Sequence, residues 1–158
     1  MREEMDTYWI YRTRVNYYRN QMVMAKLVSP ETPVAGIRSP FQGEPYGVDL
    51  KPVYQVNPKW RHPDNYCDSF GFNLFSRRLV DVMREFGVKN ETFLAEMMDK
   101  PGRRLFDLEY YVFHFLGDMF KPGPVMVDDK TYKSLMRNDL MEEILKRGIS
   151  GFEFLAQV

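Results

Sequence analysis

The sequence predicts a single α+β domain, residues 1–158, in which two helices pack on a mostly antiparallel sheet. The first observation behind this prediction is an internal repeat, because residues 74–97 align with residues 135–158 without a gap. The second is that each copy has apolar residues at helical spacing, then a glycine, then the alternation of a strand. These observations predict two equivalent helix–glycine–strand units. The identical pairs are Leu74/Leu135, Leu79/Leu140, Gly87/Gly148, Phe93/Phe154, Leu94/Leu155 and Ala95/Ala156.

The helices of the two copies have recognisable ends. Ser76 and Asn138 stand where N-cap residues belong, since their side-chain oxygens can accept hydrogen bonds from free N–H groups. Gly87 and Gly148 follow the last periodic residues, and we expect a positive φ at both because the left-handed conformation strains other residue types. The apolar residues that we expect to be buried in the two units are Leu79, Met83, Phe86, Phe93, Leu140, Ile144 and Phe154.

The N-terminal part, residues 1–66, contributes strands and an irregular segment. Residues 7–15 alternate between two faces and predict a strand, and residues 21–28 predict a second strand or a short helix that ends before Pro30. Residues 29–66 hold most of the prolines, interleaved with aromatic residues in which disordered linkers are poor. We therefore expect an ordered, irregular segment packed on the domain, and long segments of this kind are often functional.

The C-terminal part, residues 67–158, contains the two copies and the segments between them. The strand of the first copy, residues 92–98, is followed by a Pro-Gly turn and then by the strongest strand pattern of the chain, residues 106–116. A hairpin of these two strands is expected. A connection with a short helical turn near residues 129–134 then leads into the second copy.

The bulk composition limits the class of protein. A chain of 158 residues can bury a sizeable core as one domain. Its formal net charge is zero and its pI is about 6.7, which argues against a general nucleic-acid binder. A single cysteine fits a reducing compartment, and no apolar run has the ~20 residues that a membrane-spanning helix needs. We expect a cytoplasmic protein without a membrane segment, either a monomer or a weak homodimer.

No group of residues has the spacing of a catalytic or metal site. His62 and His114 lack spaced partners, and a single cysteine cannot complete a zinc site with them. Asp107 and Glu109 share one face of the strand expected there, which leaves open a hydrolase with paired carboxylates. Solvated carboxylates are far more common than catalytic ones, so we predict a protein that is not an enzyme and that uses no cofactor or metal.

The order of features in the two copies is shared with a known family. It runs serine, apolar helix, Gly-Val or Gly-Ile, a short turn and a strand with phenylalanine, and residues 76–79, 86–88, 110–115 and 147–154 carry it. Over about residues 66–158 the chain resembles a family of bacterial immunity proteins encoded beside polymorphic toxins, formerly a domain of unknown function. The resemblance implies that the protein neutralises a cognate toxin by forming a 1:1 complex, and it brings no catalytic residue.

We expect the partner-binding surface in the Pro-rich segment, because its aromatic residues have no periodicity that would bury them. Prolines make the segment rigid, and Tyr and Trp offer large contact areas with few rotatable bonds. Neighbouring charged residues would form a rim that tunes the association rate. The alternative is that these rings cover one face of the sheet. The predicted contact residues are Phe41, Tyr46, Tyr54, Trp60 and Tyr66, with Arg38, Arg61 and Asp64 at the rim.

A second hypothesis places the function in the N-terminal strand. Residues 8–19 mix tyrosines and Trp9 with Arg12, Arg14 and Arg19, a combination that can stack on single-stranded nucleic acid. The same residue types are enriched at protein interfaces. The alternative function is therefore a nucleic-acid-associated regulatory module, which the zero net charge disfavours.

Overall fold

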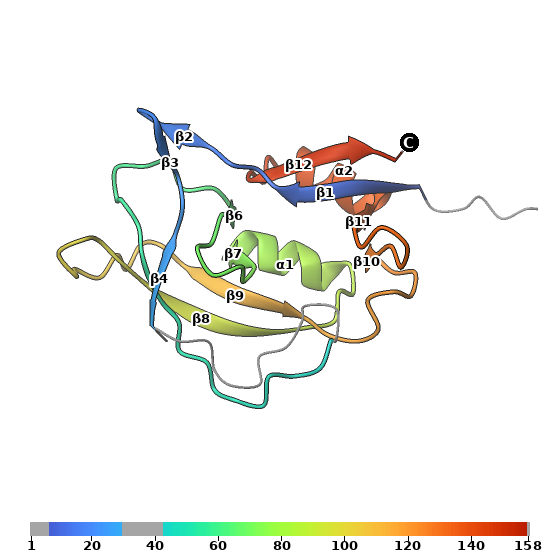
Figure 1. Cartoon of the computed structure of the whole chain (residues 1–158), viewed down its shortest axis with the longest axis horizontal. Coiled ribbons are helices and arrows are strands. Elements are labelled where there is room, and N and C mark those ends of the chain that lie inside the picture. The colour runs from blue at the N-terminus through green and yellow to red at the C-terminus, as the bar shows by residue number, and fades with distance from the viewer. Residues whose placement is uncertain (1–6, 30–42, 158) are drawn as a thin grey trace, which may run out of the picture.

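The structure, a computed structural model, describes residues 7–29 and 43–157. In these residues the chain is mostly β-sheet with two helices, which confirms the α+β class predicted from the sequence (Figure 1). The strands form two main sheets and one short separate hairpin.

The smaller main sheet consists, in spatial order, of β10 (Val125–Val127), β11 (Ser134–Arg137), β1 (Tyr8–Thr13) and β12 (Phe152–Ala156), and all its pairs are antiparallel. The N-terminal strand β1 therefore lies inside a sheet whose other strands come from the C-terminal part of the chain. Trp9 on β1 is opposite Met136 on one side and Ala156 on the other.

The larger sheet consists, in spatial order, of β4 (Lys26–Ser29), β5 (Val53–Gln55), β8 (Asn90–Met98), β9 (Tyr110–Phe115), β7 (Leu74–Ser76) and β6 (Asn65–Tyr66). Its strands pair antiparallel except β5 and β8, which run parallel. The hairpin expected between the strand of the first copy and the strand after it is confirmed, with β8 and β9 paired from Asn90/Phe115 to Ala95/Tyr110.

The two helices begin directly after strands. Helix α1 (Arg77–Glu85) follows β7, and α2 (Asn138–Lys146) follows β11. Ser76 caps α1, since its hydroxyl accepts a hydrogen bond from the backbone N–H of Leu79 at 3.4 Å. The expected cap at Asn138 is wrong, because Asn138 is the first helical residue and its Oδ1 accepts instead from the indole of Trp9 at 3.0 Å.

Both helices end in the same way. Gly87 has φ 76° and Gly148 has φ 66°, which confirms the positive φ expected at both glycines. The N–H of Val88 reaches back to the carbonyl of Met83 at 3.0 Å, and the N–H of Ile149 reaches that of Ile144, also at 3.0 Å. This pairing across six residues is the Schellman ending, which needs a left-handed residue after the last turn.

The core lies on both faces of the larger sheet. One cluster joins residues from both helices and both main sheets, and Figure 1 shows α1 between β1 and β12 on one side and β8 and β9 on the other. A second cluster covers the opposite face and includes residues from the irregular segment, such as Leu50 and Val56. Among the residues predicted to be buried, Leu79, Met83, Leu140 and Ile144 are fully enclosed, whereas Phe86, Phe93 and Phe154 are only partly buried.

Several strands differ from the sequence-based expectation. The strand expected at residues 21–28 is divided, because β2 (Tyr17–Tyr18) and β3 (Gln21–Met22) form a separate hairpin before β4 begins. The strand expected at residues 106–116 begins only at Tyr110, since the N–H of Leu108 bonds back to the carbonyl of Leu105 in a turn. Short strands were expected within residues 29–66, and β5 and β6 lie there, whereas β7, β10 and β11 were not expected.

Candidate partner-binding surface

The structure separates the residues predicted to form a partner-binding surface. Phe41 and Arg38 lie outside the described residues. Of the other six, Tyr54, Tyr66 and Asp64 are buried, Tyr46 and Trp60 are half-buried, and Arg61 is exposed. The described residues therefore do not form the continuous aromatic surface that the sequence predicted.

Tyr54 and Tyr66 belong to the core rather than to a contact surface. Tyr54 is 0 % exposed and Tyr66 is 1 % exposed. Their strands, β5 and β6, pair with β8 and β7, which turns both rings toward the second core cluster. Burial raises the pKa of both phenols, and each hydroxyl has a partner, Asp68 for Tyr54 and the Nδ1 of His62 for Tyr66. The expectation of exposed contact residues is thus wrong at these two positions.

Asp64 is a structural carboxylate rather than a rim residue. It accepts hydrogen bonds from the hydroxyl of Ser76 at 2.6 Å, from Arg78 Nε and Nη2 at 2.8 and 2.7 Å, and from the backbone N–H of Ser150 at 2.8 Å. Burial by itself raises the pKa of Asp64, but these hydrogen bonds outweigh it and hold the pKa below its usual value. The carboxylate therefore ties the start of α1 to the loop before β12.

Tyr46 anchors the irregular segment on the larger sheet. Its ring stacks on His114 with a centroid distance of 3.8 Å, and its backbone N–H donates to Glu91 Oε1 at 2.9 Å. The same oxygen lies 2.9 Å from Nδ1 of His114, which is 5 % exposed. Burial, and then the charge of Glu91, raise the pKa of Tyr46 to about 12. These contacts account for His114 as a packing residue.

The paired carboxylates proposed from the sequence do not share a strand face. Asp107 and Glu109 precede β9, and both are exposed. Glu109 accepts from Arg77 at 3.3 Å and from the hydroxyl of Tyr111 at 3.1 Å. Within residues 7–29 and 43–157, no group of three or more His, Cys, Asp or Glu side chains is placed to hold a metal ion.

Trp60 lines a groove of about 600 Å³, which we call the Trp60 groove. Its walls come from the segment after β5, the loop after β8 and the chain that enters β4. The indole Nε1 of Trp60 is shielded from water and has no hydrogen-bond partner among the described residues. Such an unpaired donor costs about 1–3 kcal/mol. The lining residues are Met24, Lys26, Gln55, Val56, Asn57, Pro58, Lys59, Trp60, Asp99, Lys100, Pro101 and Arg103.

The hairpin of β2 and β3 exposes aromatic and apolar side chains in the N-terminal part. Tyr17 is 69 % exposed and Met22, directly opposite it, is 39 % exposed. The guanidinium of Arg19 lies 5.4 Å from the ring centroid of Tyr18. In contrast, Trp9 and Tyr11 on β1 pack against the core. The sequence pattern of residues 8–19 does not distinguish the buried rings of β1 from the exposed rings of the hairpin. The reason is that β1 ends at Thr13 and the hairpin forms a separate sheet.

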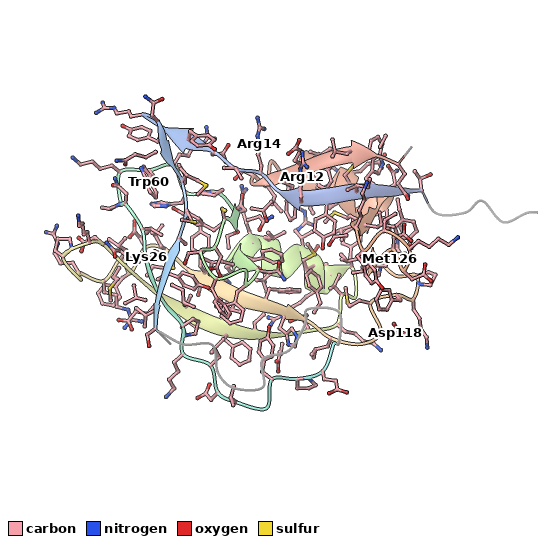
Figure 2. All side chains as sticks on the ribbon, in the orientation of Figure 1. Arg12, Arg14, Lys26, Trp60, Asp118 and Met126 are labelled. Atoms are coloured by element: carbon pink, nitrogen blue, oxygen red, sulfur yellow. The ribbon has the colours of Figure 1, made fainter. Side chains whose placement is uncertain are left out.

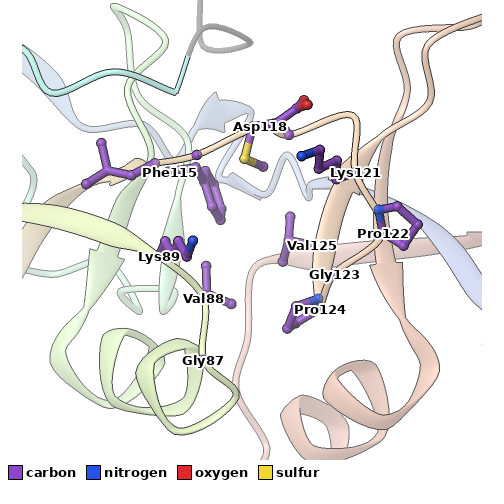
Figure 3. Close-up of a pocket in the computed structure, with 13 residues that line it drawn as sticks. Gly87, Val88, Lys89, Phe115, Asp118, Lys121, Pro122, Gly123, Pro124 and Val125 are labelled. Atoms are coloured by element: carbon purple, nitrogen blue, oxygen red, sulfur yellow. The ribbon is translucent and has the colours of Figure 1, made fainter.

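Two further hollows lie elsewhere on the molecule. One encloses about 360 Å³ between the end of α1 and the chain that enters β10, where Val88, Phe115 and Val125 form its apolar wall (Figure 3). Lys89 and Lys121 also line it (Figure 3). The other is a shallow hollow beside Arg12, Arg14 and Glu153, where Arg12 and Glu153 form an exposed ion pair at 2.9 Å.

Comparison of the sequence with family models and with curated proteins gives no relative to guide the assignment. No model of a known protein family matches the chain, and no curated protein shows detectable sequence similarity to it. None of the helices in the described part of the chain is long and apolar enough to cross a membrane. The surface features above are therefore the basis for a functional proposal.

Proposed function

We propose that this chain is a binding protein that neutralises a cognate bacterial toxin by forming a tight complex with it, without catalysis. The toxin as partner follows from the resemblance of residues 66–158 to immunity proteins. The observation that supports a protein partner is the exposed hairpin of β2 and β3, with Tyr17, Tyr18 and Met22 on its surface.

The hairpin has the properties of a preformed contact site. Its two-residue turn, Arg19-Asn20, has φ values of 48° and 66°, the positive pair of a type I′ turn that matches the twist of paired strands. The N–H of Val23, which is buried, donates to the carbonyl of Asn16 at 2.8 Å and fixes the base of the hairpin. Tyr, Met and Arg are enriched at protein interfaces, and a rigid loop loses little entropy on binding.

A second part of the proposal is that the two helix–glycine–strand units are equivalent. The order of strands in the two main sheets supports it. In each unit, the strand before the helix and the strand after it flank one antiparallel strand: β7 and β8 flank β9, and β11 and β12 flank β1. Both helices also end with the same Schellman hydrogen bonds. Each unit is then a split β–α–β motif, and the strand that completes the second unit leads into the hairpin.

The proposal is tested by co-expressing the chain with the toxin domain encoded beside it and measuring growth. Complex formation is measured by calorimetry with a catalytically inactive toxin. Tyr17→Ala combined with Met22→Ala should weaken binding by roughly 30-fold or more, the loss expected for a hot spot. The matched control is Leu145→Ala on α2, which also removes an exposed apolar side chain, 58 % exposed in this case, and should leave binding unchanged.

Two results would overturn the proposal. One is a failure of the folded protein to bind the toxin or to protect cells from it. The other is saturable binding of a single-stranded oligonucleotide that the Tyr17 and Met22 changes abolish, which would favour the nucleic-acid module instead.

A further inference from the structure

The Trp60 groove lies directly beside the proposed contact hairpin. Met24 and Lys26, which line it, follow β3 along the chain, and Figure 2 shows Trp60 and Lys26 at the end of the molecule that carries β2 and β3. A partner seated on the hairpin can therefore reach into the groove. The chemistry of the groove indicates which group of that partner it accepts.

The charges of the groove are unbalanced. It is lined by four cationic side chains and one carboxylate, Asp99. That carboxylate is already occupied, because it accepts from the backbone N–H of Arg103 at 2.7 Å and from Arg103 Nε at 2.9 Å. Lys26, Lys59 and Lys100 form no ion pair with any residue that the structure describes. A concave surface lined by charges of one sign concentrates its field and attracts the opposite charge.

A hydrogen-bond donor without an acceptor belongs to a side chain that lines the same groove. Trp60 Nε1 is the one buried side-chain nitrogen or oxygen, within the described ranges, that has no partner. Buried polar groups in native proteins are nearly always paired, and an exception calls for an explanation. A bound acceptor supplies one, because an indole N–H can only donate.

We propose that the Trp60 groove binds a carboxylate side chain from an acidic segment of the partner protein. Trp60 Nε1 donates a hydrogen bond to this carboxylate, and Lys59 and Lys100 provide the opposite charge. The identity of the partner as a toxin rests on the proposed function, whereas the carboxylate chemistry rests on the groove itself. The apolar lining by Val56, Pro58 and Pro101 accommodates the chain on either side of the acidic residue.

The turn that carries Trp60 is held by the residue at its start. Asn57 holds this turn twice, accepting from the backbone N–H of Lys59 on its Oδ1 at 2.9 Å and from that of Trp60 on its carbonyl at 3.1 Å. Nε1 is shielded in the free protein, so the proposed hydrogen bond requires the side chains over it to move aside.

The test follows the two indole N–H resonances of the ¹⁵N-labelled protein during titration with capped tetraglutamate. The chain has two tryptophans, and Trp9 already donates to Asn138 at 3.0 Å, so its resonance serves as an internal control. We expect a saturable shift of the Trp60 resonance and none of the Trp9 resonance. Tetraglutamine, which lacks the charge, should produce no shift. A fixed Trp60 resonance at millimolar tetraglutamate would overturn the inference.

Variants separate charge from packing. Lys59→Gln with Lys100→Gln should weaken tetraglutamate binding at least tenfold, whereas Lys51→Gln with Lys146→Gln, which removes two exposed lysines outside the groove, should not. Trp60→Phe keeps an aromatic side chain but removes the indole N–H, so tetraglutamate affinity should fall. Unchanged tetraglutamate affinity in this variant would overturn the role of Nε1 as the donor.

The two proposals fail in different ways. A shift of Trp60 by tetraglutamate in a protein that does not bind the toxin would leave the carboxylate site standing and overturn the immunity function. Full toxin affinity in Trp60→Phe and in the Lys59/Lys100 variant would overturn the groove as the contact and leave the function standing. A shift caused by an oligothymidylate but not by tetraglutamate would overturn the carboxylate assignment in favour of nucleic acid.

Discussion

Arg78, in the first turn of α1, donates a hydrogen bond to the carbonyl of Gly148, two residues after the end of α2, at 3.0 Å. The same guanidinium donates to both oxygens of Asp64 at 2.8 and 2.7 Å. One side chain thus joins the N-terminal end of the first helix, the irregular segment and the C-terminal end of the second helix. A cation near a helix C-terminus is also favourable for the helix dipole.

Asp64→Asn should strongly reduce the free energy of unfolding. The substitution removes the charge that faces Arg78 and puts an amide donor where Ser76 and Ser150 already donate. Breaking a fully buried, hydrogen-bonded charge pair costs about 3–5 kcal/mol, and the loss here should be smaller because the Arg78 side chain is 56 % exposed. Urea denaturation measures the loss. Glu109→Gln is the control, because its ion pair with Arg77 is exposed and should contribute at most about 1 kcal/mol.

The contribution of Asp64 should depend on pH in a defined direction. Hydrogen bonds hold its folded-state pKa below the usual value of an aspartate, so the folded protein binds the proton less readily than the unfolded chain. The stabilisation is therefore fully present above about pH 4 and is lost as the pH falls through the folded-state pKa. Unfolding free energies of the wild type and Asp64→Asn should converge at acidic pH. A constant difference down to the lowest accessible pH would contradict this assignment.

Gly87→Ala and Gly148→Ala should destabilise the protein by similar amounts, about 1 kcal/mol each. An added Cβ would meet no atom within 4 Å at either position, so the cost comes from the positive φ alone. Thermal unfolding of the two variants measures both losses. Unequal losses would count against the equivalence of the two units.

Phe152→Ala should cost more than Phe154→Ala. Phe152 is 9 % exposed and meets Tyr11 and Phe75, whereas Phe154 is only partly buried against the same cluster. A Phe→Ala change in a full core costs about 3–5 kcal/mol, so the Phe154 variant should fall below that range. Chemical denaturation of both variants decides the order, and a larger loss at Phe154 would contradict the burial pattern.

The sequence was informative wherever a pattern is local. Helical spacing, the cap at Ser76 and the glycine after each helix involve residues within a few positions of one another, and the structure agrees with them. The sequence predicted the ends of strands less accurately than the ends of helices. The alternation of residues 106–116 continues into a turn, and Phe106, which fits the pattern, is 82 % exposed.

The candidate site was harder to predict because burial in the irregular segment is set by distant pairing. Tyr54 is enclosed since β5 pairs with residues 96–98, and Tyr66 since β6 pairs with β7. Neither pairing leaves a periodic signal in strands of three and two residues. The sequence did single out Trp60, but the groove around it is assembled from three separate segments, which composition alone cannot bring together.

The position of β1 has a consequence for how the chain folds during synthesis. This strand leaves the ribosome before every other described element, yet its partners β11 and β12 are made last. Contacts between residues so far apart in the chain form slowly, because the loop between them must first be closed. The nascent strand must therefore remain unpaired until β11 and β12 have been made. Arg12 and Arg14 place charge beside its apolar residues and should limit aggregation during that interval (Figure 2).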